Sequence, residues 1–307
     1  ENLFKGLSPW KQKLPGGLIH VNVVGCALFA AISGSSAATV ATVGKMSIPE
    51  LRKRNYPEKI LLGSLAGSGT LGLLIPPSII LIIYGVAVQE SIAKLFIAGI
   101  IPGIMIALIF MSYVVIWSLI NKKEMPKILE EYSFFEKIKR SKQLLPVILL
   151  ITAVIGSIYT GIATATEAAS LGVVGALILS YFQSSLTLET FKSSLLGATK
   201  TSCMIAFILA GSTFLSLAMG FTGLPRNLAV WIQNMNLSPY LLILVLMIFY
   251  IILGMFLDGI SAVVLTMAII EPMIRQAGFD MIWFGIFLVI VVEMAQSTPP
   301  VGFNLFV

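Results

Sequence analysis

The residues Ala31-Ile32-Ser33-Gly34-Ser35-Ser36-Ala37-Ala38-Thr39 interrupt an apolar run that extends over residues 19–43. They place four hydroxyl groups and a glycine at the depth where a membrane-spanning helix has its most apolar residues. Non-helical backbone survives at that depth only when it is buried in protein or lines a cavity. The stretch therefore predicts a broken helix that serves as a binding site. The alternative is an unbroken helix with hydroxyls bonded to its own carbonyls, or a small-residue packing face.

The composition is that of a polytopic membrane protein. Of the 307 residues, 57% are hydrophobic and 11% are charged, and the mean hydropathy is +0.97. Lys and Arg outnumber Asp and Glu by 20 to 14, which in a membrane chain reports orientation and contact with anionic head groups. No basic patch with interleaved aromatic residues is present, so nucleic acid is not an expected partner. We predict an all-α chain that crosses the lipid bilayer several times.

The charged segments indicate how the first apolar run sits in the membrane. Residues 45–59 contain five basic and two acidic residues, which predicts a cytoplasmic loop. Basic residues also precede the run, and each half of residues 19–43 would be only about 18–22 Å long as a helix, too short to span alone. We therefore predict a re-entrant helical hairpin with its tip at residues 33–36.

Two pairs of consecutive prolines interrupt later apolar runs. Pro76-Pro77 lies within residues 60–85, and Pro299-Pro300 follows the last long apolar run. Each pair removes two backbone donors and clashes with the preceding turn, so the helix must break there. Leu257-Asp258-Gly259-Ile260-Ser261 separates two apolar runs in the manner of residues 33–36. The chain is predicted to contain two hairpin tips and two broken helices.

The spacing of these features predicts an internal repeat. Gly34 and Gly259 are 225 residues apart (259 − 34), and Pro76 and Pro299 are 223 residues apart (299 − 76). Two paired breaks at nearly equal spacing are unlikely by chance. Repeats with broken helices are typical of secondary transporters whose binding site lies near the midplane of the membrane.

The charges of the exit loops predict that the two repeats have opposite orientations. Residues 271–280 contain one basic and two acidic residues, in contrast to the basic segment 45–59. We divide the chain into a first inverted repeat at 1–91, scaffold helices with amphipathic surface arms at 92–223, and a second inverted repeat at 224–307. Residues 1–16 are predicted to approach the membrane along its interface, and the surface arms are predicted as amphipathic helices within residues 121–142 and at residues 187–200. The second repeat is expected to be truncated at its C-terminus.

The tips and breaks suggest ion and substrate sites. Carbonyl and hydroxyl oxygens without fixed charge suit Na⁺, so we predict one sodium between residues 33–36 and 72–78 and a second between 257–261 and 298–302. The predicted sodium ligands are Ser33, Gly34, Ser35, Ser36, Gly72, Pro76, Leu257, Gly259, Thr298, Val301 and Gly302. Half-helix N-termini favour an anionic substrate between the tips. Its candidate contacts are Ser33, Ser78, Asp258 and Asn304. No organic cofactor is expected.

Three acids lie near membrane depth. Asp258 is interpreted as functional because intramembrane acids usually serve ligands or ions, with a cap that accepts backbone N–H bonds as the alternative. It would oppose an anionic substrate unless it pairs with a hydroxyl, an ammonium group or a cation. Glu293 fits either packing or a proton path. Glu167 follows Thr164 in an N-cap pattern, which favours a structural role.

No catalytic constellation accompanies these features. The single histidine is isolated, and the sequence has no Ser-His-Asp set, no HExxH and no Walker loop. An integral-membrane enzyme is therefore the disfavoured alternative from another class.

Four ordered motifs follow one another along the chain: Ser33-Gly34-Ser35-Ser36-Ala37-Ala38-Thr39, Gly69-Thr70-Leu71-Gly72-Leu73-Leu74-Ile75-Pro76-Pro77-Ser78, Thr166-Glu167-Ala168-Ala169 and Thr298-Pro299-Pro300-Val301-Gly302-Phe303-Asn304. Together they resemble the large membrane subunit of tripartite ATP-independent periplasmic (TRAP) transporters, over nearly the whole chain. The resemblance implies ligands at the two tips and the two breaks. It also implies that N-terminal spans and a last helix lie outside this sequence.

The resemblance further implies a sodium-driven importer in the bacterial inner membrane. In such transporters an elevator-type transport domain, here residues 1–91 and 224–307, slides against a scaffold. A periplasmic binding protein delivers an organic acid, and a small four-helix membrane subunit braces the scaffold. The chain looks closest to the sialic-acid branch, in which the two subunits are often fused, and C4-dicarboxylates and other sugar acids remain open. The alternatives within transport are a binding-protein-independent sodium–carboxylate symporter and a cation–proton antiporter.

Overall fold

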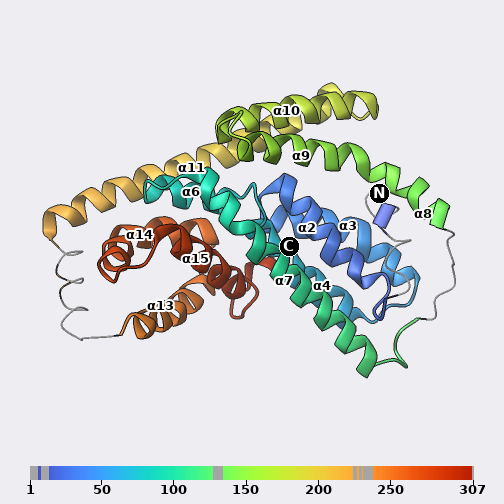
Figure 1. The fold of residues 1–307 in the computed structure, drawn as a ribbon, viewed down its shortest axis with the longest axis horizontal. Coiled ribbons are helices and arrows are strands. Elements are labelled where there is room, and N and C mark those ends of the chain that lie inside the picture. The colour runs from blue at the N-terminus through green and yellow to red at the C-terminus, as the bar shows by residue number, and fades with distance from the viewer. Residues whose placement is uncertain are drawn as a thin grey trace.

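The chain folds into helices joined by short connections, as the computed structural model shows (Figure 1). The structure describes residues 6–7, 14–126, 134–223, 227, 230 and 238–305. Within these residues every regular element is helical. The elements are α2 (Ile19–Ser33), α3 (Ser36–Lys53), α4 (Glu58–Gly69), α5 (Leu71–Leu74), α6 (Ile79–Ala87), α7 (Ile92–Ile120), α8 (Phe134–Ser141), η1 (Lys142–Leu144), α9 (Leu145–Tyr159), α10 (Ala165–Phe182), α11 (Leu188–Thr222), α13 (Pro239–Gly254), α14 (Gly259–Gln276), α15 (Met281–Gln296) and η2 (Phe303–Leu305).

Five helical segments of this described part are long and apolar enough to cross a membrane. They are Glu58–Ala87, which includes α4 to α6, Ile92–Ile120, Ala165–Phe182, Leu188–Leu215 and Gly259–Gln276. Four shorter helices, α2, α9, α13 and α15, are also apolar. The prediction of an all-α membrane protein with several spans is confirmed.

The helices form two packed groups and an outer layer (Figure 1). Helices α2 to α5 pack on one another, and α2, α4 and α5 also pack on α7, while α13, α14 and α15 form the second group. The long helix α7 contacts both groups, and α6 packs against α14. The C-terminal end of the chain lies between the two groups, in the middle of the molecule (Figure 1).

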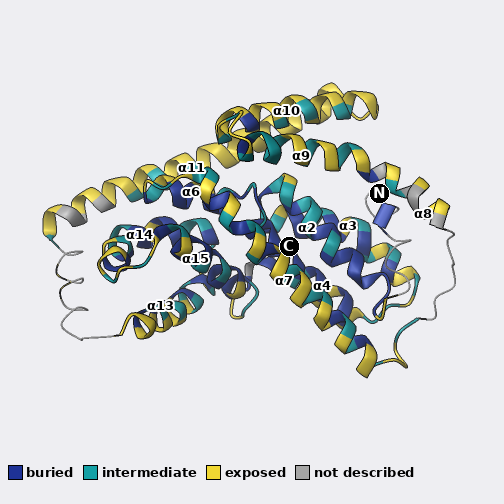
Figure 2. Ribbon diagram, in the orientation of Figure 1, coloured by how far each residue is buried: buried dark blue, intermediate teal, exposed yellow. Residues whose placement is uncertain are grey.

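The outer layer consists of α9, α10 and α11 (Figure 1). Figure 2 shows α10 and α11 mostly exposed, whereas α14 and α15 carry many buried residues. The exposed side chains of the layer are largely apolar, among them Phe207 and Phe214. Helix α11 is attached to the second group at Ser212, whose Oγ donates to the Val264 carbonyl at 2.6 Å. Exposed apolar surface on this scale is typical of contact with lipid or with a partner protein.

Two segments differ from the sequence-based prediction. The basic segment predicted as a loop at residues 45–59 is mostly helical, since α3 continues to Lys53 and α4 begins at Glu58. Ion pairs between Arg54 and Glu50 and between Arg52 and Glu58 stabilise the end of α3 and the short connection that follows it. The second stretch, predicted as a separate surface helix at residues 187–200, is continuous with the following span in α11.

The amphipathic arm after α7 is only partly visible. Its helix α8 is present at Phe134–Ser141, while Leu129 lies outside the described residues. Most of the interfacial approach predicted at residues 1–16 also lies outside them. The capping prediction for Glu167 is confirmed, because its carboxylate accepts the Thr164 N–H at 2.8 Å in a complete capping box.

The core between α6 and α15 offers a test of the packing. Tyr84 is completely buried, and its hydroxyl donates to the Met281 carbonyl at the start of α15 at 2.6 Å. We expect Tyr84→Phe to lower the stability of the purified protein by about 1–2 kcal/mol, because a buried carbonyl loses its donor. Thermal unfolding in detergent measures the effect, with Tyr240→Phe, a tyrosine that is 85% exposed, as the matched control. Equal melting temperatures for the two variants would contradict the assigned bond.

Candidate functional site

The first tip and the first break touch through their backbones. Gly34 ends α2 with a φ of 60°, and its N–H donates to the Ala30 carbonyl at 2.9 Å. Its own carbonyl accepts the Ile79 N–H, at the start of α6, at 3.3 Å. A Cβ built on Gly34 would lie 2.7 Å from the Pro77 carbonyl oxygen. Only glycine has both the backbone freedom and the space for this position.

A second close approach joins the tip to α5. A Cβ built on Gly72 would lie 2.6 Å from the Ser35 carbonyl oxygen, so only a glycine allows α5 to come this near. The same carbonyl accepts the hydroxyl of Thr39 at 2.7 Å. The structure thus brings together Gly34, Ser35 and Gly72, three of the predicted sodium ligands, and Pro76 lies in the adjoining break.

The serine hydroxyls at this end are held by local hydrogen bonds. Ser33 Oγ lies 2.9 Å from Thr39 Oγ1 and 3.3 Å from the Ser35 carbonyl. Ser78 is buried, donates to the Leu73 carbonyl, and accepts the Leu81 N–H as the N-cap of α6. These hydroxyls fix the direction of backbone carbonyls around the break. Thr39 completes this network, although sequence reasoning gave it no role.

The second tip is organised by Asp258. Its Oδ2 accepts the N–H groups of Ile260 and Ser261 at 3.1 and 3.2 Å, which caps α14. The capping alternative for this residue is therefore confirmed. Leu257 precedes the cap, and its N–H donates to the Leu253 carbonyl at the end of α13.

Gln296 connects the second tip to the first. A Cβ built on Gly259 would lie 2.8 Å from Gln296 Nε2 and 3.0 Å from Ile80 Cδ1. At its other end, Gln296 Oε1 accepts the Ser36 hydroxyl at 3.3 Å. Gln296 is buried at the end of α15 and was missed by the sequence reasoning. The available signal was an amide side chain at the end of an apolar helix, directly before a double proline.

These contacts close a ring of four segments, which we call the interlocked centre. The first tip contacts the first break through Gly34, and the first break contacts the second tip through Ile80 and Gly259. The second tip contacts the end of α15 through Gln296, which returns to the first tip at Ser36. Each tip therefore touches both broken helices.

The second break is folded mainly on itself. Thr298 Oγ1 donates to the Met294 carbonyl at 2.7 Å, and the carbonyl of Gly302, which has a φ of 58°, accepts the Leu305 N–H. Val301 is exposed. The contact of this break with the second tip runs through Gln296 and Val292, which precede the predicted ligands Thr298, Val301 and Gly302.

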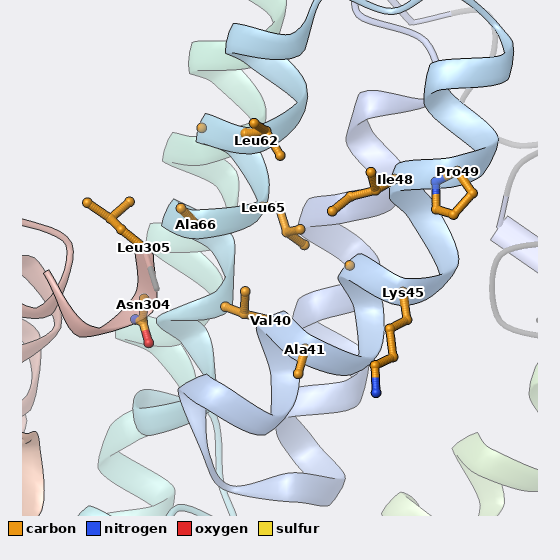
Figure 3. A pocket seen from close by; sticks show the side chains of 12 residues that line it. Val40, Ala41, Lys45, Ile48, Pro49, Leu62, Leu65, Ala66, Asn304 and Leu305 are labelled. Carbon is orange, nitrogen blue, oxygen red and sulfur yellow. The ribbon is translucent and has the colours of Figure 1, made fainter. Parts of the chain in front are cut away.

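Asn304 lies at a separate cavity. Figure 3 shows the cavity between α3 and α4, with Asn304 and Leu305 reaching its edge from η2. Its volume is about 650 Å³. The lining is mostly apolar, with Lys45 contributed by α3. Asn304 is buried, and within the described residues neither its Nδ2 nor its Oδ1 has a hydrogen-bond partner. The amide therefore has unused capacity for a ligand at this edge.

The chain is similar to membrane components of one transport system. Residues 13–307 match the family model described as "Tripartite ATP-independent periplasmic transporter, DctM component". The C4-dicarboxylate TRAP transporter large permease protein DctM of Pseudomonas aeruginosa is 36% identical over 293 residues, which cover 95% of this chain and 68% of that protein. The sialic acid large permease protein SiaM of Vibrio cholerae is 31% identical over 310 residues, covering 100% and 71%. The isethionate permease protein DctMQ of Oleidesulfovibrio alaskensis is 33% identical over 298 residues, covering 96% and 46%.

Proposed function

Because this chain belongs to the DctM component of the tripartite ATP-independent periplasmic (TRAP) transporter family, a family of multi-pass inner-membrane proteins, we propose that it couples the import of an organic acid to Na⁺. The observation that carries the proposal is the interlocked centre, in which two tips and two broken helices meet. Transport of this kind makes and breaks no covalent bond, so the chain is not proposed to be an enzyme.

Sodium is proposed to bind where the tips meet the breaks. At the first tip the Ser35 carbonyl lies beside Gly72 and the Pro77 carbonyl lies beside Gly34, and hydroxyl groups fix the direction of neighbouring carbonyls. Carbonyl and hydroxyl oxygens replace the water of a hard monovalent cation without introducing a fixed charge. The second sodium is proposed at the second tip, near Gly259 and the break at residues 298–302. Binding at either place would order a tip and so preform the substrate pocket.

The substrate is proposed to be an organic anion held between the tips. Three half-helices begin at this centre, α3 after Ser35, α6 after Ser78 and α14 after Asp258, and helix N-termini favour negative groups. A carboxylate of the sialic-acid or C4-dicarboxylate type fits this arrangement, and two relatives carry those substrates in their names. Asp258 is proposed to contribute through its cap, which orients the N-terminus of α14.

The movement is proposed to be of the elevator type. The two helix pairs α2–α3 and α13–α14, each a re-entrant hairpin, would form with α4–α6 and α15 an inverted-repeat transport domain that slides against a scaffold. The exposed apolar layer of α9, α10 and α11 supports a scaffold that contacts lipid and a small membrane subunit. A periplasmic binding protein would deliver the substrate, and a fused small subunit is one form of this assembly.

A sodium replacement tests the proposal. The complete transporter in proteoliposomes, with its binding protein added outside, is expected to take up sialic acid or succinate only when Na⁺ is present. Replacing Na⁺ by choline should reduce the initial rate at least tenfold, with protein-free liposomes as the baseline. Uptake that is unchanged in choline would overturn sodium coupling. Uptake without the binding protein would instead favour an independent symporter, and any chemical turnover of the substrate would favour a membrane enzyme.

A further inference from the structure

A buried acid without a counter-charge lies one turn before the second break. Glu293 is 3% exposed, and within the described residues its Oε1 has no hydrogen-bond partner. The backbone amide of Leu74, at the end of α5, lies within hydrogen-bonding reach of the carboxylate. One backbone donor offsets only part of the cost of burying a carboxylate, so the ionised form of Glu293 needs a cationic partner.

The helices around α15 do not supply that partner. Helices α5, α6 and α13 contain no charged residue, and α7 and α14 contribute only Lys94, Glu271 and Arg275. Arg275 pairs with Glu271 and with Glu90, and its guanidinium also donates to the Val88 carbonyl.

These charges gather at the far end of α15. At that end of α15 the Tyr84 hydroxyl donates to the carbonyl of Met281, the first residue of the helix. Met281 precedes Glu293 by twelve residues (293 − 281). Twelve residues of helix correspond to about 18 Å. Among the described residues Glu293 forms no ion pair.

A second unpartnered oxygen lies on the same side of the helix. Ser297 follows Glu293 by four residues, a spacing that makes two side chains neighbours at a helix surface. Its Oγ is buried and has no hydrogen-bond partner among the described residues. Two unsatisfied oxygen groups, one of them formally negative, thus lie near the C-terminal end of α15, where Glu293 approaches Leu74 of α5. A hard cation would satisfy both.

We propose that Glu293 and Ser297 hold an additional sodium ion between α15 and α5, apart from the charge-free carbonyl sites at the two tips. The described residues contain no group of three His, Cys, Asp or Glu side chains that could hold a metal ion, which favours a monovalent cation over a divalent one. This inference rests on the sodium coupling proposed above.

The fixed charge gives this site a function that the tip sites lack. With sodium bound, the Glu293 carboxylate is neutralised, and the domain carrying it crosses the membrane without an unpaired buried charge. With the site empty, the same movement carries an uncompensated carboxylate through a low-dielectric region, which is unfavourable. The site would therefore bias movement toward the sodium-loaded state.

Binding of ²²Na⁺ to the purified transporter tests the site without reference to a substrate. Glu293→Gln keeps an acceptor for the Leu74 amide and removes the charge, so we expect one fewer sodium bound per transporter than in the wild type. Ser297→Ala is expected to weaken one class of sodium sites about fivefold to tenfold without changing their number. Glu167→Gln, which retains a capping side chain on an exposed helix end, is the matched control and should bind as the wild type does.

The outcomes separate this inference from the proposed function. If the wild type binds ²²Na⁺ saturably, and both Glu293→Gln and Ser297→Ala bind the same number of sodium ions with the same affinity, the site is overturned. Sodium coupling would remain intact. Absence of saturable ²²Na⁺ binding by the wild type would overturn both. If Glu293→Gln does not fold, as judged by its melting temperature, Ser297→Ala decides alone, because an unchanged affinity in that variant also overturns the site.

Discussion

Gly72→Ala is expected to abolish sodium-dependent uptake while the protein remains folded in the membrane. The new Cβ would lie 2.6 Å from the Ser35 carbonyl oxygen and 2.8 Å from the Ser36 N–H nitrogen, both of which are backbone atoms. Because ordinary contact begins near 3.4 Å, the tip or α5 must move by several tenths of an ångström. Ion sites made of carbonyls depend on the position of each oxygen, so this displacement should lower the initial uptake rate by about tenfold or more.

The control for this variant lies in the same broken helix. A Cβ built on Gly63, in α4, meets no atom within 4 Å, so Gly63→Ala adds the same methyl group without a collision. We expect it to transport at the wild-type rate. The measurement is sodium-driven uptake into proteoliposomes, normalised to the amount of folded transporter. Equal rates for the two variants would remove the first tip from the ion site.

Gln296→Leu is expected to have the second largest effect, by separating the two tips. The Ser36 hydroxyl would lose its acceptor, and a buried hydroxyl without a partner is costly. We expect the sodium concentration for half-maximal uptake to rise about tenfold, with a smaller change in the maximal rate. A structural defect alone would instead lower the amount of active protein and leave the sodium concentration for half-maximal uptake unchanged.

A double-mutant cycle identifies the bridge. Ser36→Ala removes the other partner, and the two substitutions should couple by about 0.5–3 kcal/mol if they act on one hydrogen bond. Met294→Leu, a volume-conserving change at an exposed position of the same helix, is the matched control. If the effect of the double variant equals the sum of the effects of the two single variants, the Ser36–Gln296 contact does not couple the tips.

Local chemistry explains why the breaks could be located from the sequence. Consecutive prolines cannot continue a helix, and in the structure α5 ends at Leu74, with Ile75 extended before Pro76-Pro77. Gly34 ends α2 because its left-handed conformation suits glycine, and Ser35 then caps α3. The capping box at Glu167 is equally local. Each of these features depends on a few neighbouring residues, so each could be predicted without the fold.

The contacts between segments could not be predicted in the same way. The bond between Ser36 and Gln296 joins residues 260 positions apart, and the approach of Ile80 to Gly259 depends on the packing of α6 against α14. No local pattern encodes these pairings. The continuation of α3 to Lys53 was missed for a related reason, because a dense run of charges is typical of a loop but here forms ion pairs along and beyond a helix end.

The interlocked centre also determines the order in which its contacts can form during synthesis. Ser36 leaves the ribosome 260 residues before its partner Gln296, and at about 5–20 residues per second this interval lasts roughly 13–50 s. During that time Ser36 has no Gln296 to bond, while Gly34 can already contact Ile79. The first hairpin and its break are therefore available to pair before the second half is made. Synthesis of α15 supplies Gln296, so the centre can close only after that helix has been made.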